Sequence, residues 1–203
     1  CMTLSPQHPR FYTYEDYLQW DDGKRYELIQ GKRYEMLSAP NRRHQKISLK
    51  FTHEIIDFFD HPDSSCELYV APFDVRLPKN QGETNDKAIF TVVQPDLSVV
   101  CDPEKLDERG CLGAPDWVIE ILSQDSKRDV ETKFKVYEAA GVREYWIIHP
   151  SESTLTTFVR DEKEQMYRGG KMYPYDAVVS PHIFPEVKID LAKVFDLPTP
   201  SES

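Results

Sequence analysis

Asp116-Trp-Val-Ile-Glu-Ile-Leu122 is a short apolar run interrupted by one carboxylate, and it is the stretch from which the fold class is predicted. Two similar runs flank it, Asp96-Leu-Ser-Val-Val100 before it and Glu144-Tyr-Trp-Ile-Ile-His149 after it. Short runs of Val, Ile, Leu and Trp bounded by Pro, Asp or Ser are typical of buried strands. Residues 127–140 have helical spacing and end at Gly141. The stretch therefore predicts strand, loop, strand, helix and strand, the centre of an α/β domain with a mixed α+β sheet.

Asp96 and Glu120 form the first candidate pair of functional residues. If the first two strands are antiparallel neighbours joined around residue 108, Asp96 lies opposite Glu120. Opposed residues share a face, with Cβ atoms roughly 4.5–5.5 Å apart. Two carboxylates repel at that separation unless a cation lies between them. Asp116 shares this face but lies about 13 Å from Glu120, so we interpret it as a strand-start or capping residue.

The chemistry of this pair indicates Mg²⁺ or Mn²⁺ rather than zinc, because its ligands are hard oxygens without a nearby His-Cys cluster. Magnesium bound by carboxylates and a substrate phosphate is typical of phosphoryl chemistry. Lys133 lies beside a helical stripe of Val130, Phe134 and Tyr137, from which its ammonium can reach the strand ends and orient or activate water. An isolated Asp or Lys at such positions is usually solvated. Glu120 interrupts an apolar strand, where a carboxylate is rarely buried without a partner.

Several motifs in residues 11–150 resemble a known family. They are Tyr26-Glu27-Leu28-Ile29-Gln30-Gly31, Gln94-Pro95-Asp96, Pro115-Asp116-Trp117-Val118-Ile119-Glu120-Ile121-Leu122-Ser123, Lys133 followed by Tyr137, and Ala140-Gly141-Val142-Arg143-Glu144-Tyr145-Trp146. Together they resemble the PD-(D/E)XK nuclease superfamily and, within it, the Uma-type family of restriction-endonuclease-like proteins. Leu122 stands where the superfamily has its lysine. The Uma-type family shares the displacement of that lysine onto the following helix, here at Lys133.

The resemblance implies a restriction-endonuclease-like core and metal-dependent hydrolysis of DNA phosphodiesters. It implies that Asp96, Glu120 and the backbone carbonyl of Ile121 bind Mg²⁺ (or Mn²⁺), with Lys133 acting on water. It also implies that Glu27 is a third acidic group and that His44 contacts the substrate phosphate or the site. Both have simpler interpretations: Glu27 as an edge-strand carboxylate in water, and His44 as a surface residue at a helix start.

The whole chain of 203 residues suits one nuclease-like domain. We place its core at about 41–150, an N-terminal helix and hairpin at 11–40, and a C-terminal strand extension at 151–197, read as sheet extension or dimer surface. A helix at about 41–59 carries an apolar stripe of Ile47, Phe51, Ile55 and Phe58. A strand is expected from Ile89 through Asp96, and residues 102–113 are expected to be a mobile, charged loop.

Composition excludes several classes of protein. Hydrophobic residues make up 39% of the chain, as in ordinary globular proteins. The N-terminal residues lack the apolar segment of a signal peptide, and no apolar run reaches the roughly 18 residues of a membrane span.

The four cysteines, Cys1, Cys66, Cys101 and Cys111, have no paired short spacing. We therefore expect a cytoplasmic protein with reduced thiols, although Cys101 and Cys111 can approach each other across their loop.

The net charge of −10 counts against a surface that coats nucleic acid. A local basic groove is compatible with it, and the candidates are Lys32-Arg33, Arg42-Arg43 with Lys46 and Lys50, and Lys127-Arg128. Cutting both strands of a duplex would favour a homodimer. Two alternatives stay open: a catalytically inactive nuclease-fold domain that binds DNA or protein, and another metal-dependent phosphohydrolase.

Overall fold

The chain forms a mixed α+β fold, and the computed structural model describes residues 10–36, 40–123 and 127–199, without the side chains at 127–128. Its larger sheet has the order β12-β11-β10-β9-β6-β3, and β13 also pairs with β11. These strands are β3 (Glu67–Val70), β6 (Leu97–Val100), β9 (Trp117–Ile121), β10 (Glu144–His149), β11 (Thr154–Asp161), β12 (Met166–Tyr167) and β13 (Lys171–Pro174). Only β9 and β10 are parallel within this sheet as described, and α3 (Lys127–Ala140) connects them. The predicted mixed α/β core is confirmed.

The pairing of β6 with β9 has the register predicted from the sequence. Leu97 lies opposite Ile119 and Val99 lies opposite Trp117. One step beyond the ladder, the same register brings Asp96 to the position opposite Glu120. Trp117 and Ile119 face the core under α2, whereas Val118 faces the core under α3. By strand alternation Glu120 faces α3 as well.

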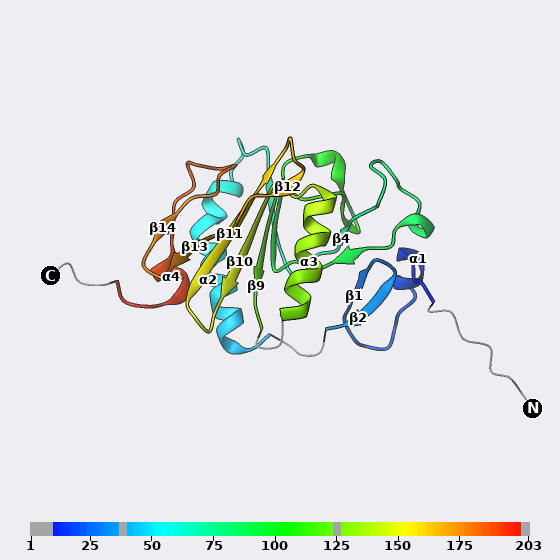
Figure 1. The fold of residues 1–203 in the computed structure, drawn as a ribbon, viewed down its shortest axis with the longest axis horizontal. Helices are drawn as coiled ribbons and strands as arrows, with labels where there is room; N and C mark the ends of the chain where they lie inside the picture. The colour runs from blue at the N-terminus through cyan, green and yellow to red at the C-terminus, as the bar shows by residue number, and fades with distance from the viewer. Residues whose placement is uncertain (1–9, 37–39, 124–126, 200–203) are drawn as a thin grey trace, which may run out of the picture.

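α2 (Arg42–Phe59) covers one face of the larger sheet and α3 covers the other, as Figure 1 shows with α3 in front and α2 behind. The buried residues of α2 are Ile47, Phe51, Ile55 and Phe59. The predicted stripe was wrong at its last member: Phe58 is 37% exposed and Phe59 is 5% exposed. The buried residues recur every four positions, which keeps them on one side of an α-helix.

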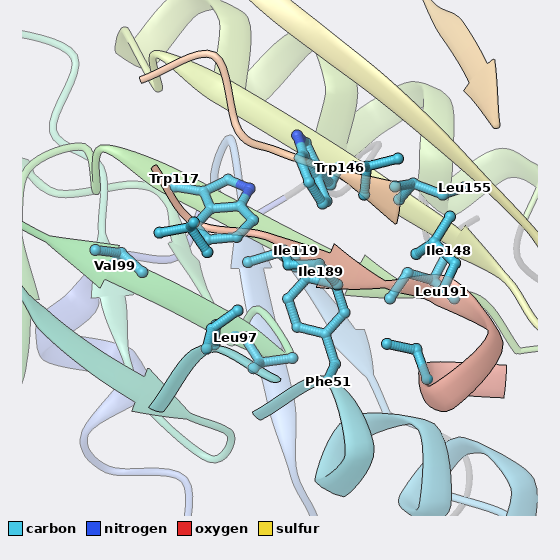
Figure 2. Packing of buried hydrophobic residues seen from close by; sticks show 14 of the residues in the cluster. Phe51, Leu97, Val99, Trp117, Ile119, Trp146, Ile148, Leu155, Ile189 and Leu191 are labelled. Carbon is cyan, nitrogen blue, oxygen red and sulfur yellow. The ribbon is translucent and has the colours of Figure 1, made fainter. Parts of the chain in front are cut away.

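The core under α2 is built on aromatic contacts. The Trp117 and Trp146 rings meet edge to face at 4.8 Å between centroids, and Phe51 packs against both, as Figure 2 shows. The C-terminal segment completes this core through β14 (Val178–Val179), β15 (Ile189–Asp190) and α4 (Leu191–Phe195). The expectation of a strand extension holds for β11 to β13. Beyond them the segment packs on α2 instead of extending the sheet.

The smaller sheet has the order β2-β1-β5-β4-β8-β7. Its strands are β1 (Tyr26–Ile29), β2 (Lys32–Glu35), β4 (Val75–Arg76), β5 (Val92–Val93), β7 (Leu106–Asp107) and β8 (Gly110–Leu112). The β1–β2 hairpin turns at Gln30-Gly31, both with positive φ, as a two-residue turn of type I′ requires. The short helix α1 (Tyr14–Tyr17) has Thr13 as its N-cap, and 3-10 turns lie at η1 (Asp86–Ala88) and η2 (Pro103–Lys105).

Residues 94–96 carry the chain from the smaller sheet to the larger one. The expected continuous strand from Ile89 through Asp96 was therefore wrong, because β5 pairs with β1 and β4 and β6 starts only at Leu97. Pro95 lacks the N–H that a continuous ladder needs, which favours a break at this point. The expectation of a mobile loop at 102–113 was also wrong, because η2, β7 and β8 lie there.

Cys66 and Cys101 form a disulfide, which corrects the expectation of reduced thiols. Cys66 precedes β3 and Cys101 follows β6, and the register of these antiparallel strands sets Glu67 opposite Val100. The two cysteines are thus the next opposed pair. Cys111, the alternative partner for Cys101, is a buried free thiol in β8 of the other sheet. Within the described ranges, no helix is long and apolar enough to cross a membrane.

Glu144 is a buried carboxylate that ties the C-terminal segment to β10. It accepts hydrogen bonds from the Trp146 indole at 2.7 Å and from the backbone N–H groups of His182 and Ile183 at 2.9 and 3.0 Å. Burial raises the pKa of Glu144 above its ordinary value, although these three donors oppose the shift. A raised folded-state pKa means that the folded protein binds this proton more tightly than the unfolded chain does.

We expect Glu144→Gln to flatten the pH dependence of stability. The Glu144 contribution to stability is complete below its unfolded pKa of about 4.3 and is lost as the pH rises through the raised folded-state pKa. Gln does not titrate, so the variant should lack this decline. Urea unfolding between about pH 4 and pH 8 measures it. Parallel pH profiles for the two proteins would contradict the prediction.

Candidate active site

Asp96 lies at the start of β6, where it links α2 to the end of β9. Its Oδ2 accepts the backbone N–H of Ile121 at 2.7 Å, and its Oδ1 lies 3.1 Å from Nε2 of His44. His44 is in the first turn of α2, where its own N–H is bound by the N-cap Asn41. One carboxylate therefore connects the helix start to the strand end.

Glu120, Lys133, Tyr137 and Glu27 form a buried cluster on the α3 face of the sheet. The Lys133 ammonium lies 3.0 Å from Glu120 Oε1 and 2.9 Å from Glu27 Oε1. The Tyr137 hydroxyl donates to the same Glu120 oxygen at 2.6 Å. Glu27 also accepts the backbone N–H of Gln94 at 2.8 Å. All four residues are less than 8% exposed, so their charges interact with little screening by water.

The pKa values of both Glu120 and Lys133 are raised above their ordinary values. Burial raises the pKa of Glu120, and the nearby Asp96 and Glu27 charges raise it further, against the lowering effects of Lys133 and the Tyr137 hydrogen bond. Burial alone would lower the pKa of Lys133, but the Glu120 and Glu27 carboxylates outweigh it and raise this pKa well above its ordinary value. Lys133 is therefore the ammonium ion at neutral pH.

The pKa of His44 also depends on a balance between burial and neighbouring charges. Burial lowers its pKa, but the hydrogen bond and charge of Asp96, together with the charge of Glu120, outweigh burial and raise the pKa above the ordinary value. Its other ring nitrogen, Nδ1, is buried and has no hydrogen-bond partner within the part of the chain that the structure describes. The Glu120 charge acts on both His44 and Lys133, so it connects the two groups electrostatically.

Every residue predicted for the site thus lies in one of two neighbouring groups. Asp96 with His44 and Ile121 forms one, and Glu120 with Lys133 and Glu27 forms the other. The second group draws on both sheets, because Glu27 lies on β1 and Glu120 on β9. Asp116 binds the backbone N–H of Cys101 at 2.8 Å and Arg143 at 3.4 Å, which fits the capping role predicted for it.

Comparison with known proteins places this chain in a family. The Uma2 family model, described as "Putative restriction endonuclease", matches residues 14–192. The chain belongs to the Uma2 family. A similar relative is the uncharacterized protein slr1290 of Synechocystis sp. (strain ATCC 27184 / PCC 6803 / Kazusa), 28% identical over 126 residues, which are 61% of this chain and 60% of that protein. The chain therefore matches less than two thirds of the length of that relative.

A solved structure shows the same fold. It is a crystal structure described as a putative nuclease belonging to DUF820 from Anabaena variabilis ATCC 29413, with a TM-score of 0.71 and 22% sequence identity. The match covers 91% of this chain and 98% of that one. This Uma2 chain therefore has a nuclease-like fold over most of its length.

The donor set of this Uma2 site fits a hard divalent cation. Within residues 10–36, 40–123 and 127–199, no group of three or more His, Cys, Asp or Glu side chains is arranged to bind a metal. Asp96 and Glu120 supply two carboxylates at opposed positions, and Ile121 offers a backbone carbonyl. One or two carboxylates completed by water and substrate phosphate is the arrangement that Mg²⁺ favours. The set therefore suits Mg²⁺ or Mn²⁺ and lacks the closed ligand shell of structural zinc.

The basic residues predicted for a groove have different contacts in the structure. Lys46 and Lys50 pair with Asp196, and the Arg33 guanidinium lies over the Tyr26 and Trp20 rings at 4.4 and 5.2 Å. The side chains of Lys127 and Arg128 lie outside the described residues. Lys32 is exposed on β2, which pairs with β1, and Arg42 is exposed at the start of α2.

Tyr137 donates a hydrogen bond to Glu120, but from the sequence it was part of a family motif and was not predicted as a site residue. It was assigned to the apolar stripe of the helix, where it does lie, with a fully buried ring in the core under α3. The available signal was its spacing of four residues after Lys133, which places both side chains on one face of the helix. That spacing could not show where its hydroxyl points.

Proposed function

We propose that this protein is an endodeoxyribonuclease that hydrolyses DNA phosphodiester bonds with Mg²⁺ or Mn²⁺. The observation that supports it most is the position of Glu120, a buried carboxylate that lies next in register to Asp96 and is bound to a lysine ammonium. A buried carboxylate whose pKa is raised by burial and by neighbouring charges is a candidate for a reaction-site group. Membership of the Uma2 family supports the same reaction class.

In the proposed reaction, Asp96, Glu120 and the Ile121 carbonyl would bind the divalent ion. Such an ion lowers the pKa of bound water and stabilises negative charge on the phosphate. The protein side chains position this chemistry. Asp96 is fixed by the Ile121 N–H and His44, and Glu120 is fixed by Lys133 and Tyr137.

Lys133 and His44 would provide positive charge at the reacting phosphate. An ammonium group has three N–H donors, and Glu27 and Glu120 account for two of them among the described contacts. We assign the third to a water molecule or a phosphate oxygen. Glu27 then acts mainly on Lys133, because their ion pair fixes the ammonium beside Glu120. His44, whose pKa Asp96 raises, would add a second positive group at Asp96 in its protonated form.

DNA is proposed to bind in a local basic groove beside the site and not over a generally basic surface. The exposed Lys32 lies on β2, which pairs with the strand of Glu27, and the exposed Arg42 is the first residue of α2, which carries His44; both would provide phosphate contacts. A duplex cut in both strands would need two copies of the site, which favours a homodimer. Cytoplasmic location and the organisation of residues 1–203 as one domain stay predictions.

The proposal is tested by incubating the protein with supercoiled and single-stranded DNA at low salt, with Mg²⁺, Mn²⁺ or EDTA. Cleavage is expected with either ion and none with EDTA. Binding should weaken steeply as salt rises, because phosphate contacts release counterions. If the protein binds DNA but does not cut it with any divalent ion, the inactive binding domain becomes the better assignment. Hydrolysis of free nucleotides without salt-sensitive DNA binding would favour a different phosphohydrolase.

A further inference from the structure

Glu120 Oε1 accepts hydrogen bonds from two successive turns of α3. Lys133 Nζ lies at 3.0 Å and the Tyr137 hydroxyl at 2.6 Å from this one oxygen. The other carboxylate oxygen, Oε2, receives neither of these bonds. Two donors on one oxygen restrict rotation of the carboxylate plane. Rotation in either direction would move Oε1 away from at least one donor and break a short, charge-assisted bond. The two oxygens of Glu120 are therefore not equivalent: Oε1 is bound by the protein, and Oε2 is the one that can face a cation.

The two donors differ in how firmly they fix that oxygen. Lys133 is shared with Glu27, and its ammonium sits at the end of a flexible four-carbon chain. Tyr137 has a rigid ring that is fully buried and packs against Tyr145 at 5.0 Å between centroids. Its hydroxyl direction is therefore set by the core of the protein. Tyr137 is the donor that determines the orientation of Glu120.

Tyr137 also lies too deep to contact DNA. Its side chain is 0% exposed and lies between α3 and the sheet, in the cluster formed with Val118, Val142 and Ile147. A buried hydroxyl costs free energy unless it has a hydrogen-bond partner, and the Glu120 carboxylate is that partner. Any effect of this hydroxyl on the reaction must pass through Glu120.

We propose that Tyr137 is a positioning residue, which directs Glu120 Oε2 toward the divalent ion; this rests on the proposed nuclease function. Removal of the hydroxyl should leave the ion pair with Lys133 intact but allow the carboxylate to rotate. Groups that orient a metal ligand typically change metal affinity or activity by about 10–100-fold when they are removed. The expected effect of Tyr137→Phe is a loss of this size in Mn²⁺ affinity.

The test compares Tyr137→Phe with Tyr167→Phe. Tyr167 lies in the same core cluster, and its hydroxyl is buried without a hydrogen-bond partner among the described residues. Both variants lose one buried hydroxyl, but only Tyr137 donates to Glu120. Mn²⁺ affinity is measured by calorimetry without DNA, and cleavage rates are measured across a range of Mn²⁺ and DNA concentrations. Both use temperatures at which circular dichroism shows each variant fully folded.

The expected result is weaker Mn²⁺ binding and a lower kcat for Tyr137→Phe, an unchanged KM for DNA, and wild-type values for Tyr167→Phe. Excess Mn²⁺ should restore part of the lost rate. Wild-type Mn²⁺ affinity and cleavage in Tyr137→Phe would overturn the inference while leaving the nuclease function in place. Equal losses of Mn²⁺ affinity and cleavage in both variants would also overturn it. Such losses would come from a change in core packing and not from the hydrogen bond to Glu120. A wild-type protein that binds no Mn²⁺ and cuts no DNA would instead overturn the proposed function.

Discussion

Glu120→Ala is expected to abolish divalent-ion-dependent cleavage of DNA while leaving the protein folded. Glu120 is the carboxylate on which the proposed ion, Lys133 and Tyr137 all converge. Groups that act directly at a reacting centre typically contribute about 10²–10⁴-fold to the rate. The fold should persist, because Lys133 keeps its ion pair with Glu27 at 2.9 Å. Single-turnover cleavage of supercoiled DNA with Mg²⁺ and with Mn²⁺ measures the loss.

Asp116→Asn provides the matched control for Glu120→Ala. Asp116 immediately precedes the same strand, at the end away from the site, and its carboxylate binds a backbone N–H and Arg143. Asn retains an acceptor oxygen, so this variant should cut DNA like the wild type. A folded Glu120→Ala protein that cleaves at the wild-type rate would remove Glu120 from the reaction. Equal losses in the two variants would point to a general effect of altering β9.

Lys133→Met should cause a larger loss of stability than either Glu120→Ala or Tyr137→Phe. The substitution leaves Glu120 and Glu27 buried without the ammonium that compensates both of them. Removing one partner of a buried ion pair typically costs about 3–5 kcal/mol. Methionine fills a similar volume, so the loss reports charge rather than a cavity. Urea unfolding at neutral pH measures it, and cleavage should be lost as well.

A second substitution separates this electrostatic cause from packing. In Glu27→Gln/Lys133→Met, Glu120 is the one carboxylate left in the cluster of Glu27, Glu120, Lys133 and Tyr137, so a substantial part of the lost stability should return. Lys135→Met, an exposed position on the same helix, should change stability by no more than about 0.5 kcal/mol. If Lys133→Met matches the wild type in stability, the ion pairs with Glu27 and Glu120 contribute little. Absence of recovery in the double variant would assign the loss to packing.

The register of the site was predictable from local sequence because β6 and β9 are close in the chain and each has an unambiguous apolar pattern. Counting outward from residue 108 sets Asp96 opposite Glu120, and the observed pairs of Leu97 with Ile119 and Val99 with Trp117 follow the same count. The proximity of Glu27 and His44 to this pair could not be obtained by counting. It depended on the family resemblance, because the two residues come from a different sheet and a distant helix.

Contacts that depend on side-chain direction or on distant pairing were not predictable. The Cys66–Cys101 disulfide follows from the pairing of β3 with β6, which no local pattern specified. The passage between sheets at Gln94-Pro95-Asp96 was missed because a proline inside an apolar run is compatible with either a kink or a strand end. The Tyr137 hydrogen bond requires the position of one hydroxyl in a packed core, which periodicity does not contain.

The packing of the C-terminal segment against α2 has a consequence for protein synthesis. Ile189, Leu191 and Phe195 belong to the core that α2 covers, and α2 carries His44 in its first turn. The ribosome adds these residues after every residue of the proposed site. A nascent chain that already contains Lys133 therefore still lacks part of the surface on which α2 rests. We expect the His44–Asp96 contact to form late, after translation has passed Phe195, so that the proposed site is still incomplete in the growing polypeptide.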